Sequence, residues 1–150
     1  MAKRLDPARS GHGRWLTTPV AAPFQREFVA DDAAPAAARA FVNAAVDELV
    51  PPPHPVMLRD DIELVVSELV TNAVRAQSPT VSVEVGFERD RVVLRVEDLG
   101  SGWPEPREAG IHDTNGRGLA LVSAICAAWG VRLSGPERKT VWAELSATTG

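Results

Sequence analysis

The chain has 150 residues, 45% of them hydrophobic, and a formal net charge of -4. This length and composition suit one domain with a sizeable core, and the charge excludes the overall basic field typical of nucleic-acid or membrane-surface binding. Cys126 is the single cysteine, so no intramolecular disulfide can form and a reducing compartment is expected. No apolar stretch of signal-peptide length follows the basic residues at the start, and no apolar run anywhere reaches membrane-spanning length, so we expect a cytoplasmic protein.

The first part of the chain predicts an arm, a strand and a helix. Residues 1–22 lack hydrophobic periodicity and predict a flexible arm, whereas the folded domain is expected over residues 23–148. The stretch "FQREFVA" is a strand candidate. Asp31, Asp32 and Pro35 then form a helix-start signal ahead of "AAARAFVNAAVDELV", which ends at a run of prolines.

The middle of the chain changes from helical to strand periodicity. Apolar residues at helical spacing predict a second helix from Leu58 to Ala76. After it, "TVSVEVGF" and "RVVLRVED" alternate apolar and polar residues and are joined by a tight connection, which predicts a β-hairpin. The loop from Leu99 to Asn115 is long for a compact domain and is interpreted as a lid.

The last part predicts a third helix and a second hairpin. The nearly all-apolar run "GRGLALVSAICAAW" predicts a buried helix that reaches Trp129, and "VRLSGPERKTVWAEL" predicts two paired strands. This order of elements favours an α+β fold in which helices cover one face of a mainly antiparallel sheet.

Two polar residues interrupt the second helix. Glu68 and Asn72 lie four residues apart, side by side on the flank of the apolar stripe where the helix should meet the sheet. They could be a boundary pair with solvated heads, which is the commoner case on helices. Alternatively, Asn72 could offer an oxygen to Mg²⁺ while Glu68 orients or deprotonates a nucleophile.

Asp98 continues the apolar side of its strand, since alternation places it on the face of Val92, Leu94 and Val96. A carboxylate on a buried face is costly unless it accepts hydrogen bonds. It could cap its own loop, or it could accept from the exocyclic amine of a base such as adenine. The sequence leaves both interpretations open.

The stretch "NGRGLALV" places glycines at the start of an apolar helix. Unpaired N–H groups and the positive end of the helix dipole could hold a phosphate there, with Arg117 adding charge. The glycines could equally serve a tight helix start. The three histidines show no metal-ligand spacing with each other or with Cys126, which disfavours a zinc site.

In their joint order, these motifs resemble those of the GHKL ATPases, and within them the small anti-sigma-factor serine/threonine kinases. The stretch "LVVSELVTNAV" is similar to the N box of that family, "VEDLGSG" to its first glycine box, and "GRGLALV" followed by "WGV" to its second. The resemblance covers residues 24–146. It implies the Bergerat fold, a two-layer α/β sandwich with ATP held beside a mobile lid.

The resemblance also implies roles for individual residues. Glu68 would be the catalytic base or water-orienting residue, Asn72 the Mg²⁺ ligand and Asp98 the residue that reads adenine. Near the chain end, alternation favours Lys139 on the inner face, whereas a looser motif match favours Thr140 as a nucleotide contact. Further nucleotide-binding and lid residues are expected at Gly100, Gly102, Gly116, Arg117, Gly118 and Leu119.

The function implied by the resemblance is that of an ATP- and Mg²⁺-dependent protein serine/threonine kinase that regulates transcription. Its expected partners are a sigma factor and a STAS-type antagonist, which it would phosphorylate, and a homodimer through the open sheet face is a further expectation. The chain departs from the family at Ala76, where many of these kinases have a histidine. The alternative function is therefore a nucleotide-dependent protein-binding module that transfers no phosphate.

Overall fold

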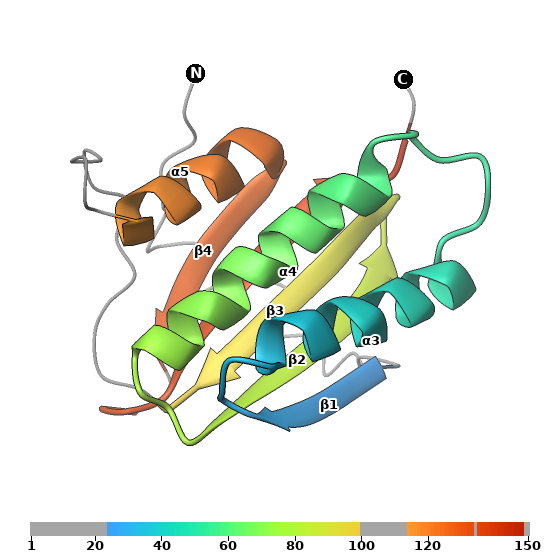
Figure 1. The fold of residues 1–150 in the computed structure, drawn as a ribbon. Coiled ribbons are helices and arrows are strands. Elements are labelled where there is room, and N and C mark those ends of the chain that lie inside the picture. The colour runs from blue at the N-terminus through green and yellow to red at the C-terminus, as the bar shows by residue number, and fades with distance from the viewer. Residues whose placement is uncertain (1–23, 100–113, 134, 149–150) are drawn as a thin grey trace.

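The computed structural model describes residues 24–99, 114–133 and 135–148, with the backbone alone described for residues 114–118. The strands form one five-stranded sheet in the order β1-β2-β3-β5-β4, and every neighbouring pair is antiparallel. The three helices of the described part cover one face of this sheet, and no described helix lies on the other face, which we call the open face (Figure 1). The two-layer α+β arrangement expected from the sequence is confirmed.

The first strand and helix follow the sequence signals closely. β1 spans Phe24–Val29 and α3 spans Ala34–Leu49, with Pro35 in its first turn. The carboxylate of Asp31 accepts a hydrogen bond from the Ala33 N–H at 3.0 Å, which satisfies one of the amides left over at a helix start. The buried face of α3 packs on the sheet through Ala34, Ala38, Val42, Ala45 and Val46.

The second helix, α4, spans Leu58–Arg75, one residue short of the predicted end, and lies across the middle of the sheet (Figure 1). Its predicted apolar stripe is buried, and the buried residues are Leu58, Ile62, Val65, Val66, Leu69, Val70 and Ala73. Spacing of three and four residues puts these side chains on one face, so burial of that face orients the polar residues between them.

The predicted hairpin is formed by β2, Thr80–Glu88, and β3, Arg91–Asp98. Arg89 and Asp90 connect the strands with φ angles of 51° and 61°, the left-handed conformation that a tight two-residue hairpin turn requires. The pairing places Val83 opposite Val96, so the apolar faces of both strands align on the helix side of the sheet.

The third helix is shorter than the sequence predicts. α5 spans Thr114–Ile125 and β4 spans Ala128–Leu133, so the predicted continuation of the helix to Trp129 is wrong. Trp129 lies in β4 opposite Ala143 of β5, Lys139–Ser146, and is fully buried. A short apolar run is compatible with a buried helix and with a buried strand. Here the residues from Ala128 onwards form a strand because they pair with β5.

Candidate functional site

Several of the predicted site residues lie at the end of the sheet where α4 ends. Here β2 begins and β3 ends, with Val81 opposite Asp98, and β5 begins with Lys139 opposite the same aspartate. α5 ends near the opposite end of the sheet, where β4 begins with Ala128 opposite Glu144. Its first residues therefore lie toward the end of the sheet where α4 ends. Four separate chain segments therefore meet at one edge (Figure 1).

Asp98 lies on the helix side of the sheet, as alternation predicted, and its side chain is 3% exposed. Lys139 projects from the directly opposed position on β5 and is 7% exposed, with 3.7 Å between its Nζ atom and Oδ1 of Asp98. Two opposite charges are thus buried side by side at the edge where α4 ends. Burial of such a pair is tolerated because each charge offsets the desolvation of the other.

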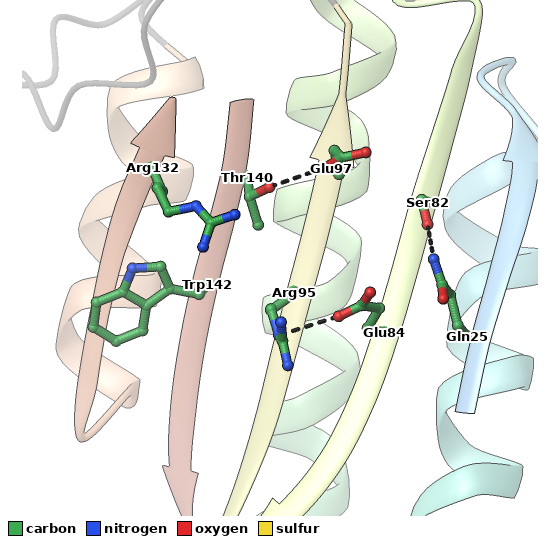
Figure 2. Close-up of a pocket in the computed structure, with 8 residues that line it drawn as sticks. All are labelled: Gln25, Ser82, Glu84, Arg95, Glu97, Arg132, Thr140 and Trp142. Atoms are coloured by element: carbon green, nitrogen blue, oxygen red, sulfur yellow. Dashed lines mark hydrogen bonds and ion pairs between the residues drawn. The ribbon is translucent and has the colours of Figure 1, made fainter. Parts of the chain in front are cut away.

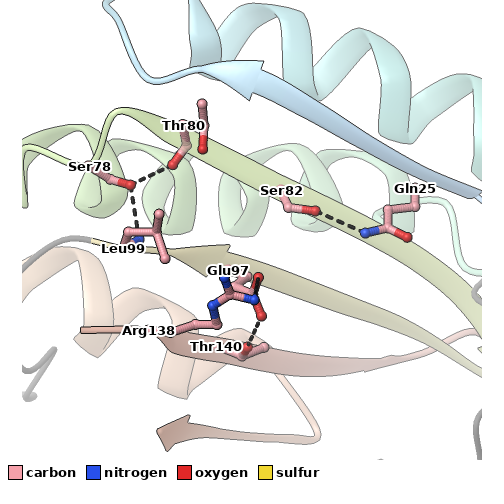
Figure 3. A network of polar contacts seen from close by, with 8 residues as sticks. All are labelled: Gln25, Ser78, Thr80, Ser82, Glu97, Leu99, Arg138 and Thr140. Atoms are coloured by element: carbon pink, nitrogen blue, oxygen red, sulfur yellow. Dashed lines mark hydrogen bonds and ion pairs between the residues drawn. The ribbon is translucent and has the colours of Figure 1, made fainter. Parts of the chain in front are cut away.

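Ser78 ties this corner together (Figure 3). Its Oγ atom donates to the carbonyl of Thr80 at 2.5 Å and accepts from the N–H of Leu99 at 3.0 Å. The N–H of Ser78 in turn donates to the carbonyl of Ala73 in α4. The hydroxyl and the backbone N–H of buried Ser78 together link the end of α4, the start of β2 and the residue after Asp98. Ser78 was not predicted as a site residue, because its only signal in the sequence is a small polar residue between a helix and a strand.

Glu68 and Asn72 lie on α4, where both side chains are half-buried rather than solvated. The Nδ2 atom of Asn72 is buried and has no hydrogen-bond partner within the part of the chain that the structure describes. A buried amide without a partner costs free energy unless a ligand satisfies it. As drawn, Nδ2 can donate to a phosphate oxygen, and a half-turn of the amide presents the carbonyl oxygen to a cation.

The structure describes only some of the residues predicted in the two glycine-containing motifs. Gly116, Arg117 and Gly118 lie in the first turns of α5, which begins two residues earlier than the glycines suggested, at Thr114. Leu119 is buried in the apolar core, so its side chain packs rather than lining an open site. Gly100 and Gly102 lie outside the described residues, as do residues 100–113 of the lid that was predicted over Leu99–Asn115; the last two residues of that prediction belong to α5.

Thr140 is not brought together with the other predicted residues. It lies on the open face of the sheet, with its Oγ1 atom 3.4 Å from a carboxylate oxygen of Glu97, whereas its neighbour Lys139 lies on the helix side. Of these two residues, Lys139 is the one that the register of β3 with β5 places directly opposite Asp98.

The open face carries a separate polar pocket of about 160 Å³ (Figure 2). Arg95 lies in this pocket, with 3.1 Å between its Nε atom and Oε2 of Glu84. Burial lowers the pKa of the Arg95 guanidinium, and the negative charge of Glu84 opposes that shift. Trp142 forms one wall and lies on the face opposite Val141. The further lining residues are Gln25, Ser82, Glu97, Arg132 and Thr140. The sheet separates this pocket from Asp98.

Among the residues that the structure describes, no group of three or more histidine, cysteine, aspartate or glutamate side chains is arranged to hold a metal ion. A Mg²⁺ that enters with a nucleotide does not need such a cage, because phosphates and water supply most of its ligands. Asn72 is the described side chain that fits this chemistry. No helix in the described ranges is both long and apolar enough to cross a membrane.

Comparison with known proteins agrees with the fold. The model of the family of histidine kinase-, DNA gyrase B- and HSP90-like ATPases matches residues 57–149, which include α4, the sheet from β2 onwards and α5. Among solved structures, the histidine kinase AdeS of Acinetobacter baumannii is similar at 20% identity and a TM-score of 0.43, over 84% of this chain and 68% of that one. No curated protein matches the chain. Since the family model spans more than half of the sequence, the chain belongs to the family of histidine kinase-, DNA gyrase B- and HSP90-like ATPases.

Proposed function

We propose that this domain binds ATP with Mg²⁺ at the edge where α4 ends, and that it acts as a protein serine/threonine kinase of the anti-sigma-factor type. The single observation that carries the site is the buried Nδ2 atom of Asn72, which finds no hydrogen-bond partner among the described residues. A polar group that is buried and unsatisfied in the folded chain suits a ligand that completes it.

Each residue has a role that follows from its place. The carboxylate of Asp98, buried on the helix side, accepts from the exocyclic amine of adenine, since carboxylates pair with such amines. The amide of Asn72 holds the metal–phosphate group, and the first turn of α5 directs backbone N–H groups toward the same end of the sheet. Bound Mg²⁺ would neutralise charge on the phosphates.

Glu68 supplies the chemistry. It lies one turn before Asn72 on α4 and is half-buried, so its carboxylate flanks the proposed phosphate position without lying in the core. We assign to it the orientation and deprotonation of a substrate hydroxyl, the role that a carboxylate plays in phosphoryl transfer to serine or threonine. Transfer would break the bond from the terminal phosphorus to the bridging oxygen and form a phosphoester on the protein substrate.

The proposed partners are a sigma factor and a STAS-type antagonist that is phosphorylated on serine or threonine. The motifs "LVVSELVTNAV" and "VEDLGSG" support this assignment through their resemblance to the anti-sigma-factor kinases. The competing function is a binding module that captures a partner when nucleotide is bound and transfers no phosphate. Ala76 follows the last residue of α4, where related kinases carry histidine, and this difference favours testing the binding module as an alternative.

A labelled-ATP assay with Mg²⁺ and a candidate STAS partner separates the two functions. Glu68→Gln should abolish transfer while retaining ATP binding, because the substitution removes the base and conserves size. Glu48→Gln, an exposed change on α3, is the matched control and should transfer phosphate like the wild type.

Wild-type protein that binds ATP but labels no antagonist would exclude the kinase and leave the binding module. Asn72→Ala should lose Mg²⁺-dependent ATP binding in calorimetry. Unchanged affinity in that variant would remove the proposed site from both functions.

A further inference from the structure

The buried pair of Asp98 and Lys139 has a consequence for recognition of the base. Both side chains project from the helix side of the sheet at directly opposed positions of β3 and β5, and each is more than nine-tenths buried. In the proposed function Asp98 meets the exocyclic amine of adenine, and the inference below depends on that function.

The geometry of the pair is that of a Coulombic contact. The 3.7 Å between Nζ of Lys139 and Oδ1 of Asp98 exceeds the roughly 2.7–3.2 Å of a hydrogen bond between such groups. Directly opposed residues on one face of an antiparallel pair have neighbouring Cβ atoms. A planar group that donates to the Asp98 carboxylate from the helix side can therefore place a neighbouring atom within reach of the Lys139 ammonium.

The two groups offer complementary chemistry to the edge of adenine. The carboxylate only accepts hydrogen bonds and the ammonium only donates them. On adenine the N6 amine, a donor, is next to the ring nitrogen N1, an acceptor. We propose that Lys139 is a specificity-determining residue, which donates to N1 of adenine while Asp98 accepts from the N6 amine.

The test compares ATP with 1-deaza-ATP, in which a C–H group replaces N1 and leaves the amine in place. Both are titrated against a fluorescent ATP analogue bound to the full chain. Wild-type protein should bind 1-deaza-ATP roughly tenfold or more weakly than ATP, the size expected for loss of one charge-assisted hydrogen bond. Lys139→Met should bind the two nucleotides equally, because it lacks the donor.

Arg138→Met is the matched control, since it removes a positive charge from the adjacent residue. Arg138 is half-exposed and pairs with Glu97 at 3.6 Å (Figure 3). The control should keep the wild-type preference for ATP. Folding of each variant is checked by circular dichroism. If Lys139→Met does not fold, Lys139→Gln replaces it and should show a smaller preference than the wild type.

The outcomes separate this inference from the proposed function. If the wild type binds neither nucleotide, the proposed function is lost and the inference with it. Equal affinities in the wild type would overturn the role of Lys139 while leaving ATP binding intact. A preference for ATP that persists in Lys139→Met would also overturn this role. If Lys139 only neutralised Asp98, its loss would weaken the binding of both nucleotides alike and leave the preference unchanged.

Discussion

The close approach of Trp142 to Gly130 predicts that Gly130→Ala, which adds a single methyl group, destabilises the fold. The two residues are directly opposed on β5 and β4, and the Trp142 side chain is buried. A Cβ atom at Gly130 would lie 2.6 Å from Cζ2 and 2.8 Å from Cε2 of the indole, inside van der Waals contact. Because the indole is rigid and the overlap lies along its ring, Gly130→Ala must displace the whole side chain.

The size of the effect follows from two opposed terms. Overpacking of this kind costs about 1–3 kcal/mol. Replacement of glycine by alanine recovers about 0.4–1 kcal/mol by restricting the unfolded chain. Gly86→Ala in β2 is the matched control, because a Cβ atom there meets nothing within 4 Å. The free energy of unfolding of Gly130→Ala should therefore be about 1–3 kcal/mol below that of Gly86→Ala.

Urea denaturation followed by circular dichroism measures this difference. In a Trp142→Val background, which removes the indole, Gly130→Ala should behave like Gly86→Ala. Equal stabilities of the two single variants in the wild-type background would refute the packing argument, and so would a Gly130→Ala penalty that survives the loss of the indole.

Three further predictions concern buried polar groups. Ser78→Ala should lower the free energy of unfolding by about 1–3 kcal/mol, since it removes the hydrogen bonds of the Ser78 hydroxyl to the first residue of β2 and to the residue that follows β3; no change in a urea titration would contradict this. Arg91→Met removes the guanidinium 2.8 Å from buried Glu144 and should cost about 1–3 kcal/mol. Arg59→Met, in an exposed ion pair, should lower the free energy of unfolding by less than about 1 kcal/mol. Similar melting temperatures of Arg91→Met and Arg59→Met would contradict the expectation that the buried ion pair stabilises the fold more than the exposed one. Asn72→Ala should change stability by less than about 1 kcal/mol, because its buried Nδ2 has no partner among the described residues; a larger loss in chemical denaturation would mean that the amide serves the fold.

The boundaries of the elements show where sequence periodicity is sufficient. α4 was predicted to within one residue, since a stripe at helical spacing over that length has no alternative as a strand. α5 was predicted four residues too long, because the run from Cys126 to Trp129 is apolar in every register. Ala128 and Trp129 form a strand only because β5 lies beside them and supplies backbone partners.

For the site, the sequence by itself determined which residues share a face. Helical spacing placed Glu68 and Asn72 at the flank of α4, and alternation placed Asp98 on the inner face, because these are local geometric properties of helices and strands.

The tertiary structure alone decided what lies across from each of those residues. Lys139 became the partner of Asp98, Thr140 moved to the open face, and Ser78 joined α4 to both strands. The contacts of Lys139 with Asp98, of Thr140 with Glu97 and of Ser78 with Leu99 join residues more than twenty apart in the chain. They depend on strand register, which is set by pairing over the whole sheet and cannot be deduced from any one stretch of sequence.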